Sequence, residues 1–167
     1  SGILGVNLMV AITDYEELFT VALEEEIDVI IIGAGLPLKL PPIVFEKGIE
    51  NIHTKFIPKV SSAKAARVIF SYWAKNFNAI PDAVVVEGPM AGGHLGFKKE
   101  ELNDELVPLS DLVKETVHEI KAFEQEFKKE VPVIAGGGIY SGSDIYDIMQ
   151  HGAKGVKMGT RFVPTVE

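Results

Sequence analysis

Short apolar runs that alternate with helical patterns constrain the fold of this chain more than any other feature. The run at 28–33 is apolar on both faces, which is typical of a parallel strand covered on both sides. Similar runs lie at 6–11, 54–60, 82–87, 132–135 and 155–162, and helical spacing of apolar residues is found at 14–25, 42–47, 63–76, 112–129 and 144–149. This repetition predicts an α/β protein with a parallel sheet and a single domain over residues 1–167.

Two closures of such a sheet remain open. A (β/α)8 barrel and an open doubly wound sheet both place functional groups after the carboxyl ends of the strands. Six strands fall short of the eight that a barrel needs. A polar, acidic stretch at 97–108 is expected to be a surface loop.

The composition excludes several kinds of site. The net charge is −8 and no Lys/Arg cluster interrupts the acidity, which argues against nucleic acid or a membrane surface as a partner. The chain has no cysteine, so it has no disulfide and no thiol nucleophile. No two histidines have metal-ligand spacing, so no metal is expected. No signal peptide or membrane span is evident, and we expect a cytoplasmic protein.

Two glycine-bearing strand ends form the strongest motif pair. Gly136, Gly137 and Gly138 follow one apolar run, and Met158-Gly-Thr-Arg-Phe162 follows the next, about twenty residues later. Backbone N–H groups at such ends bind anions, and barrels commonly hold a phosphate between their last two loops. The glycines alone could simply form tight turns, but the pair favours a phosphate site.

A histidine loop follows the run at 82–87. Gly92 and Gly93 precede His94, and glycines let backbone approach a ligand closely. Histidine has a pKa of about 6.5, so His94 is the best candidate for a general base in a chain without cysteine. A loop histidine bonded to backbone is an equally good interpretation of the pattern.

Three polar residues lie in or at the ends of the apolar runs. Asn7 and Glu87 would either contact a ligand or hydrogen-bond to backbone, because a buried polar group needs a partner. Lys59 ends its run at the same edge, and we expect it to be solvated rather than to contact an anion.

Four segments together resemble the nitronate monooxygenase family, also called the 2-nitropropane dioxygenases. They are Gly5–Val10, Glu87–Gly96, Val131–Ile139 and Gly152–Phe162. The superfamily also contains the flavin-dependent enoyl-acyl-carrier-protein reductase, and these motifs separate the two branches poorly.

The resemblance implies a TIM barrel that holds FMN non-covalently. The chain matches the family's strands three to eight, so we expect an incomplete barrel that alone binds FMN weakly or not at all and is inactive. Completion by a parent chain or by a partner, as in a homodimer, stays open.

The resemblance also implies residue roles. His94 would take the α-proton of a nitroalkane or orient a nitronate, and the flavin and dioxygen would then yield a carbonyl compound and nitrite. The FMN contacts would be Asn7, Glu87, Gly92, Gly93, Gly136, Gly137, Gly138, Lys157, Met158, Gly159 and Thr160.

Three positions depart from the monooxygenase pattern. The family often has glutamine at positions 87 and 157 and an acidic residue at position 90, where this chain has Glu87, Lys157 and Met90. A glutamate at position 87 also occurs in the enoyl reductase branch. The substrate is therefore a nitronate or an enoyl thioester, and a third alternative is a non-catalytic fragment that binds a phosphate ligand.

Overall fold

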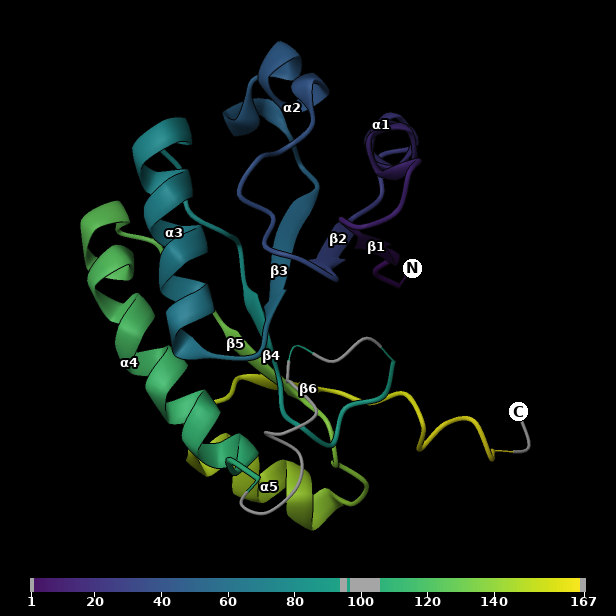
Figure 1. Cartoon of the computed structure of the whole chain (residues 1–167), viewed down its shortest axis with the longest axis vertical. Helices are drawn as coiled ribbons and strands as arrows, with labels where there is room; N and C mark the ends of the chain where they lie inside the picture. The colour runs from purple at the N-terminus through teal and green to yellow at the C-terminus, as the bar shows by residue number, and fades with distance from the viewer. Residues whose placement is uncertain (1, 94–95, 97–105, 166–167) are drawn as a thin grey trace.

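The alternation of strands and helices is confirmed in the computed structural model, which describes residues 2–93, 96 and 106–165 (Figure 1). The strands are β1 (Gly5–Met9), β2 (Val29–Gly33), β3 (Lys55–Val60), β4 (Val84–Glu87), β5 (Val133–Gly136) and β6 (Gly155–Lys157). The helices are α1 (Tyr15–Glu24), α2 (Pro42–Lys47), α3 (Ala63–Phe77), α4 (Leu109–Phe127) and α5 (Gly142–Gln150), with a 3-10 turn at Ile49–Asn51.

The strand order decides between the two closures. All neighbouring strands are parallel and follow one another in the order β1-β2-β3-β4-β5-β6. A doubly wound sheet reverses its order at a switch point, and the described strands show no such reversal. Right-handed crossovers in consecutive order put the helices on one face of the sheet. The fold is an incomplete TIM-barrel-like α/β fold with its helices on the outside (Figure 1).

The two faces of the sheet are packed differently. The main core lies between strands and helices, where Phe19, Ile30, Phe70 and Val84 are fully buried. On the inner face Ile57, Ala83 and Val85 form a small second cluster. The inner face is therefore apolar in its middle, and the functional groups lie beyond it at the carboxyl ends of the strands.

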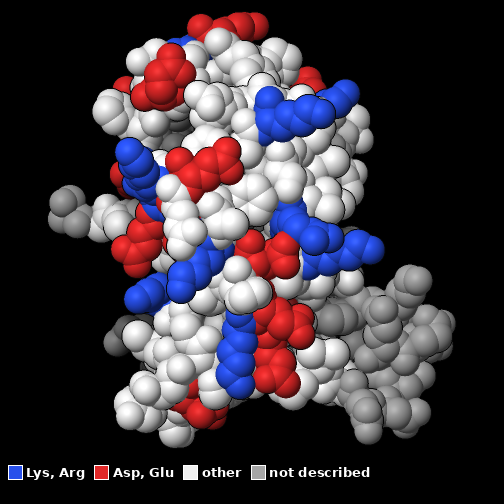
Figure 2. Space-filling view, turned by 90° about the vertical axis from the view of Figure 1, so that its left-hand side faces the viewer, with Lys and Arg blue, Asp and Glu red and all other residues white. Residues whose placement is uncertain are grey.

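The outer face carries charges of both signs. Figure 2 shows acidic and basic side chains interspersed there, and Arg67 of α3 lies 3.4 Å from Glu119 of α4. No described helix is long and apolar enough to cross a membrane.

The apolar stripe of α1 differs from the prediction. The helical spacing at 14–25 predicts a core stripe of Leu18, Val21 and Ala22, with Phe19 as a further candidate, but Leu18 and Val21 are 44% and 49% exposed. The helix instead buries Tyr15, Phe19, Ala22 and Leu23. The spacing alone could not choose between these stripes, because both recur with the helical period.

Capping residues fix where two helices begin. Ser62 accepts a hydrogen bond from the backbone N–H of Ala65 at the start of α3, as the sequence indicated. At α5 the cap is Ser141 rather than Ser143, because Ser141 and Asp144 form a reciprocal capping box. Thr13 or Asp14 is the sequence's candidate cap for α1, but Asp14, which precedes the helix, makes no side-chain cap hydrogen bond.

Candidate functional site

The carboxyl ends of three neighbouring strands bring predicted site residues into one row. Glu87 of β4 pairs in register with Gly136 of β5, which in turn pairs with Lys157 of β6. Gly136 has no side chain, so Glu87 and Lys157 can meet across the strand between them. The row lies just above the apolar middle of the inner face.

Glu87 is the centre of an ion-pair cluster. Its Oε1 lies 2.7 Å from Lys157 Nζ, and its Oε2 lies 3.2 Å from Lys59 Nζ. The glutamate is buried at 9% exposure. One carboxylate thus holds two ammonium groups, and the cluster keeps a net positive charge. Because both of its oxygens are engaged, Glu87 orients the lysines and is a poor candidate for a base.

Lys59 is held from two sides. Glu87 pairs with its ammonium group, and Gly33 of β2 leaves room for its aliphatic chain. A Cβ at position 33 would lie 2.5 Å from Lys59 Cε. The lysine side chain is 16% exposed, so the expectation of a solvated lysine was wrong. Its aliphatic stem packs over the bare backbone of the neighbouring strand, as long cationic side chains often do.

A hollow of about 380 Å³ lies on the Lys157 side of the cluster, and we call it the glycine hollow. It is lined by Glu87, Met90, Ala91, Gly92, Gly93, Gly136, Gly137, Gly138, Ile139, Tyr140, Lys157, Met158, Gly159, Thr160 and Arg161. All of the residues that the sequence assigned to cofactor contact lie here, except Asn7. Arg161 also lines the hollow. It was not predicted as a cofactor contact, although it belongs to the Met158–Phe162 motif.

Four glycines of this hollow illustrate two different roles. Gly137 and Gly138 have φ of +102° and +76°, and a Cβ on Gly137 would lie 2.8 Å from the backbone N of Ala91. These two are required by the turn itself. Gly92 and Gly159 lack positive φ, and a Cβ on either would meet no described heavy atom within 4 Å. Their bare backbone faces open space in the hollow.

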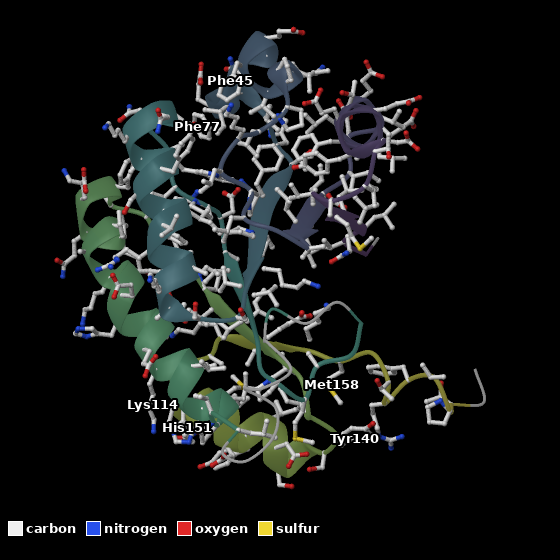
Figure 3. All side chains as sticks on the ribbon, viewed as in Figure 1. Phe45, Phe77, Lys114, Tyr140, His151 and Met158 are labelled. Atoms are coloured by element: carbon white, nitrogen blue, oxygen red, sulfur yellow. The ribbon has the colours of Figure 1, made fainter. Side chains whose placement is uncertain are left out.

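The chemistry of the lining suits a phosphate ester. Lys157 and Arg161 supply cations, and bare glycine backbone permits close approach of an anion. Met158 and Tyr140 add apolar and aromatic surface. Figure 3 shows both in the lower half of the view, well away from Phe45 and Phe77.

Two predicted site residues are not among the lining of the glycine hollow: Asn7, and His94, whose structure is not described. Asn7 is exposed on the edge strand β1, so the expectation of a buried amide was wrong. His94 lies outside the described residues, and its role stays a prediction. Among the other histidines, His118 is exposed on α4, and His151 Nε2 lies 3.8 Å from Asp147 Oδ2. The described residues contain no cluster that could hold a metal.

A second hollow of about 370 Å³ lies on the Lys59 side, and we call it the apolar hollow. It is lined by Ala11, Ala34, Gly35, Leu36, Lys59, Val60, Ser61, Ala65, Glu87 and Gly96. Glu87 lines both hollows and therefore forms part of the wall between them. The sequence motifs did not predict this hollow. The residues that could have indicated it are Lys59 and Gly33, which lie at the carboxyl ends of the adjacent strands β3 and β2.

Comparisons with known proteins find similar sequences and similar structures. The family model described as nitronate monooxygenase matches residues 2–167. A probable nitronate monooxygenase of Staphylococcus saprophyticus is 30% identical over 156 residues, which are 92% of this chain and 38% of the relative. FabK from Thermotoga maritima superposes with a TM-score of 0.73 and 32% identity, over 97% of this chain and 42% of that chain.

A third relative is named for a different activity. It is the Rhodococcus jostii (3aS,4S,5R,7aS)-5-hydroxy-7a-methyl-1-oxo-octahydro-1H-indene-4-carboxyl-CoA dehydrogenase, 35% identical over 112 residues. These residues are 66% of this chain and 24% of the relative. The chain thus spans less than half the length of each of these three relatives.

Proposed function

Because the chain belongs to the nitronate monooxygenase family, we propose that it is the FMN-binding part of an oxidoreductase that converts alkyl nitronates and dioxygen to a carbonyl compound and nitrite. One observation carries this proposal. The residues assigned to cofactor contact come from three loops far apart in the sequence, and all but Asn7 line one hollow.

The residues of the glycine hollow would contribute to FMN binding in two ways, through backbone contact and through charge. The backbone at Gly92 and Gly159 would approach the phosphate, and Lys157 and Arg161 would balance its charge. FMN, when bound, supplies the redox chemistry, and the protein supplies binding and orientation. His94 would take the α-proton from a neutral nitroalkane as a general base, or orient a nitronate.

The proposal is tested by comparing FMN with riboflavin, which lacks the phosphate. The two flavins are titrated into the purified chain, and quenching of flavin fluorescence is measured. We expect weak binding in which FMN has at least a tenfold lower Kd than riboflavin. In Gly159→Ala the methyl group enters the hollow, and the preference for FMN is lost.

Gly142→Ala is the matched control. Gly142 also has open space at its Cβ position, but it lies at the start of α5 and outside the glycine hollow. This variant should keep the preference for FMN. Equal affinity of the wild-type chain for FMN and riboflavin, or no FMN binding by the full-length protein, would overturn the proposal.

An FMN- and NADH-dependent enoyl-acyl-carrier-protein reductase is the second candidate. Two observations favour it: Glu87, which that branch shares, and the likeness to FabK over 97% of the chain. Anaerobic mixing of the flavin-loaded full-length protein with NADH separates the candidates. Rapid flavin reduction followed by reoxidation with an enoyl thioester identifies the reductase, whereas nitronate turnover with oxygen uptake and indifference to NADH identifies the monooxygenase.

A further inference from the structure

We propose that Met90 is a site of reversible oxidation, and that its sulfoxide breaks the contact with Gly138 in the wall of the glycine hollow. Methionine is the only residue type of this chain that carries sulfur, because the chain has no cysteine. The consequence for FMN affinity rests on the proposed function, since it requires the glycine hollow to hold the flavin phosphate.

Met90 lies in the wall between the glycine hollow and a third hollow. The third hollow has a volume of about 290 Å³ and extends from the loop after β4 to α5, where Asp144 and Ile148 line it. Met90, Gly137 and Gly138 line both hollows and therefore form part of the wall between them. A change in the side chain of Met90 thus alters the lining of the glycine hollow directly.

The side chain of Met90 covers the bare backbone of Gly138. Gly138 has φ of +76°, and a Cβ at this position would lie 3.2 Å from Met90 Cβ and 3.4 Å from Met90 Sδ. Ala91 lies in the same way over Gly137, so two consecutive residues of one loop pack on two consecutive glycines of another. A thioether suits this contact because it is apolar and polarizable.

Met90 is also the most exposed of the four methionines. Its side chain is 69% exposed and that of Met149 is 45% exposed, whereas Met9 and Met158 are half-buried. An oxidant in solution must reach the sulfur before it can react. We therefore expect Met90 to be oxidised before the two half-buried methionines.

The oxidation is a two-electron oxygen transfer from hydrogen peroxide. The sulfur of Met90 attacks one peroxide oxygen, so an S–O bond forms and the O–O bond breaks. The proton of the transferred oxygen passes to the other oxygen, which leaves as water. The sulfur is oxidised and the peroxide is reduced. Two-electron reduction of dioxygen, a substrate of the proposed reaction, would yield this oxidant beside Met90.

The sulfoxide no longer suits the contact with Gly138. Oxidation converts the apolar thioether into a polar group, and a polar oxygen held against the wall costs free energy unless it is hydrogen-bonded. The exposed side chain can instead turn toward water. The loop at 90–93 then loses its packing on Gly137 and Gly138, and FMN affinity falls because the hollow is no longer preorganised.

Treatment of the flavin-free full-length protein with hydrogen peroxide tests this proposal. Peptide mass spectrometry measures the gain of one oxygen atom at each methionine, and quenching of flavin fluorescence measures the Kd for FMN. We expect Met90 to be oxidised about threefold faster than Met9 and Met158, and the Kd for FMN to rise about fivefold. Methionine sulfoxide reductases should restore the original Kd.

Three variants assign the effect to one residue. Met90→Leu has no sulfur at this position, so peroxide should leave its Kd at the value of the untreated variant. Met90→Gln places a polar group at the contact without oxidation, and it should raise the Kd to about that of the oxidised protein. Met149→Leu removes an exposed methionine of α5 outside the glycine hollow and should keep the full effect of peroxide.

NMR shifts of the Gly137 and Gly138 amides report the same contact without any flavin. They should move when the wild type is oxidised and stay in place in Met90→Leu. Four results contradict the proposal: earlier oxidation of Met9 or Met158, amide shifts that oxidation of Met90 leaves unchanged, a measurable Kd for FMN that it leaves unchanged, and a peroxide effect that survives in Met90→Leu. Absence of FMN binding before oxidation, together with amide shifts that depend on Met90, would refute the proposed function alone.

Discussion

Lys157 Nζ lies 2.7 Å from Glu87 Oε1, although β5 separates the strands that carry them. These are two of the three positions at which the resemblance implied another residue, glutamine at both. In this chain a glutamate and a lysine stand there instead, and they pair as opposite charges. Lys59 joins the same carboxylate and leaves the cluster positive.

Glu87→Gln should destabilise the chain by about 1–3 kcal/mol, because it leaves two partly buried ammonium groups beside one another. The partial exposure of the lysines keeps the effect below that of a fully buried pair. Urea unfolding, followed by the fluorescence of Trp73, the only tryptophan, measures the change. Asp111→Asn, at an exposed pair, should cost less than about 0.5 kcal/mol.

The double variant Glu87→Gln with Lys157→Gln should recover part of that loss, because it restores the neutral pair that the family often carries. A double-mutant cycle gives the coupling energy directly. Additive effects of the two substitutions would show that the residues do not compensate each other.

Tyr15→Phe should stabilise the chain by up to about 1 kcal/mol, because a buried hydroxyl without a hydrogen bond costs free energy. The side chain is buried, and its hydroxyl has no hydrogen-bond partner among the described residues. Tyr72→Phe, on the partly buried side of α3, is the control and should change stability less. Equal effects in the two variants would contradict the assignment.

Tyr15 also predicts a pH dependence. Burial raises the pKa of its phenol, and the nearby charge of Glu16 raises that pKa further. Below the unfolded-state pKa of about 10 the phenol is neutral in both states, so the free energy of unfolding does not depend on its titration. Above that pH the unfolded state ionises first, so the free energy of unfolding falls as pH rises toward the folded-state pKa. The difference in unfolding free energy between wild type and Tyr15→Phe should therefore grow in favour of the variant above about pH 10. A pH-independent difference would be the contrary result.

Ser141→Ala should cost about 0.5–2 kcal/mol, because it removes the side-chain cap of α5. The Tyr140 backbone N–H, the Ser141 hydroxyl and the Ser141 backbone N–H hold the pKa of Asp144 below its usual range. That pKa should rise in the variant, which an NMR titration detects. Ser143→Ala, two residues further along, should leave α5 more stable than Ser141→Ala does.

The strands were predictable because each is a continuous apolar run between glycines, prolines or acidic residues. The order of the strands was not, because the same β-α pattern serves a barrel and an open sheet. The strand register places Glu87 and Lys157 on either side of Gly136. This register cannot be inferred from a single sequence, because the two residues are 70 positions apart.

The sequence predicted the parts of the candidate site that lie within one short motif. It did not predict the contacts between residues far apart in the sequence. The three glycines at 136–138 and the segment from Lys157 to Thr160 line one hollow because each follows a strand of the same sheet. Lys59 was misjudged, since its burial depends on Gly33, 26 residues earlier and on another strand. Asn7 was misjudged because apolar sequence neighbours do not bury a residue on an edge strand.

Gly137→Ala and Gly159→Ala should have opposite profiles. At Gly137 an alanine must adopt φ near +102° and approach the backbone N of Ala91, so we expect a loss of about 1–3 kcal/mol of stability. At Gly159 the added methyl group meets open space, so stability should change by less than about 0.5 kcal/mol while FMN binding falls. Urea unfolding and FMN titration of both variants give the two profiles. The phosphate site is refuted if both variants lose stability and Gly159→Ala does not lower FMN affinity more than its loss of stability explains. In that case both glycines are needed only for the conformation of their turns.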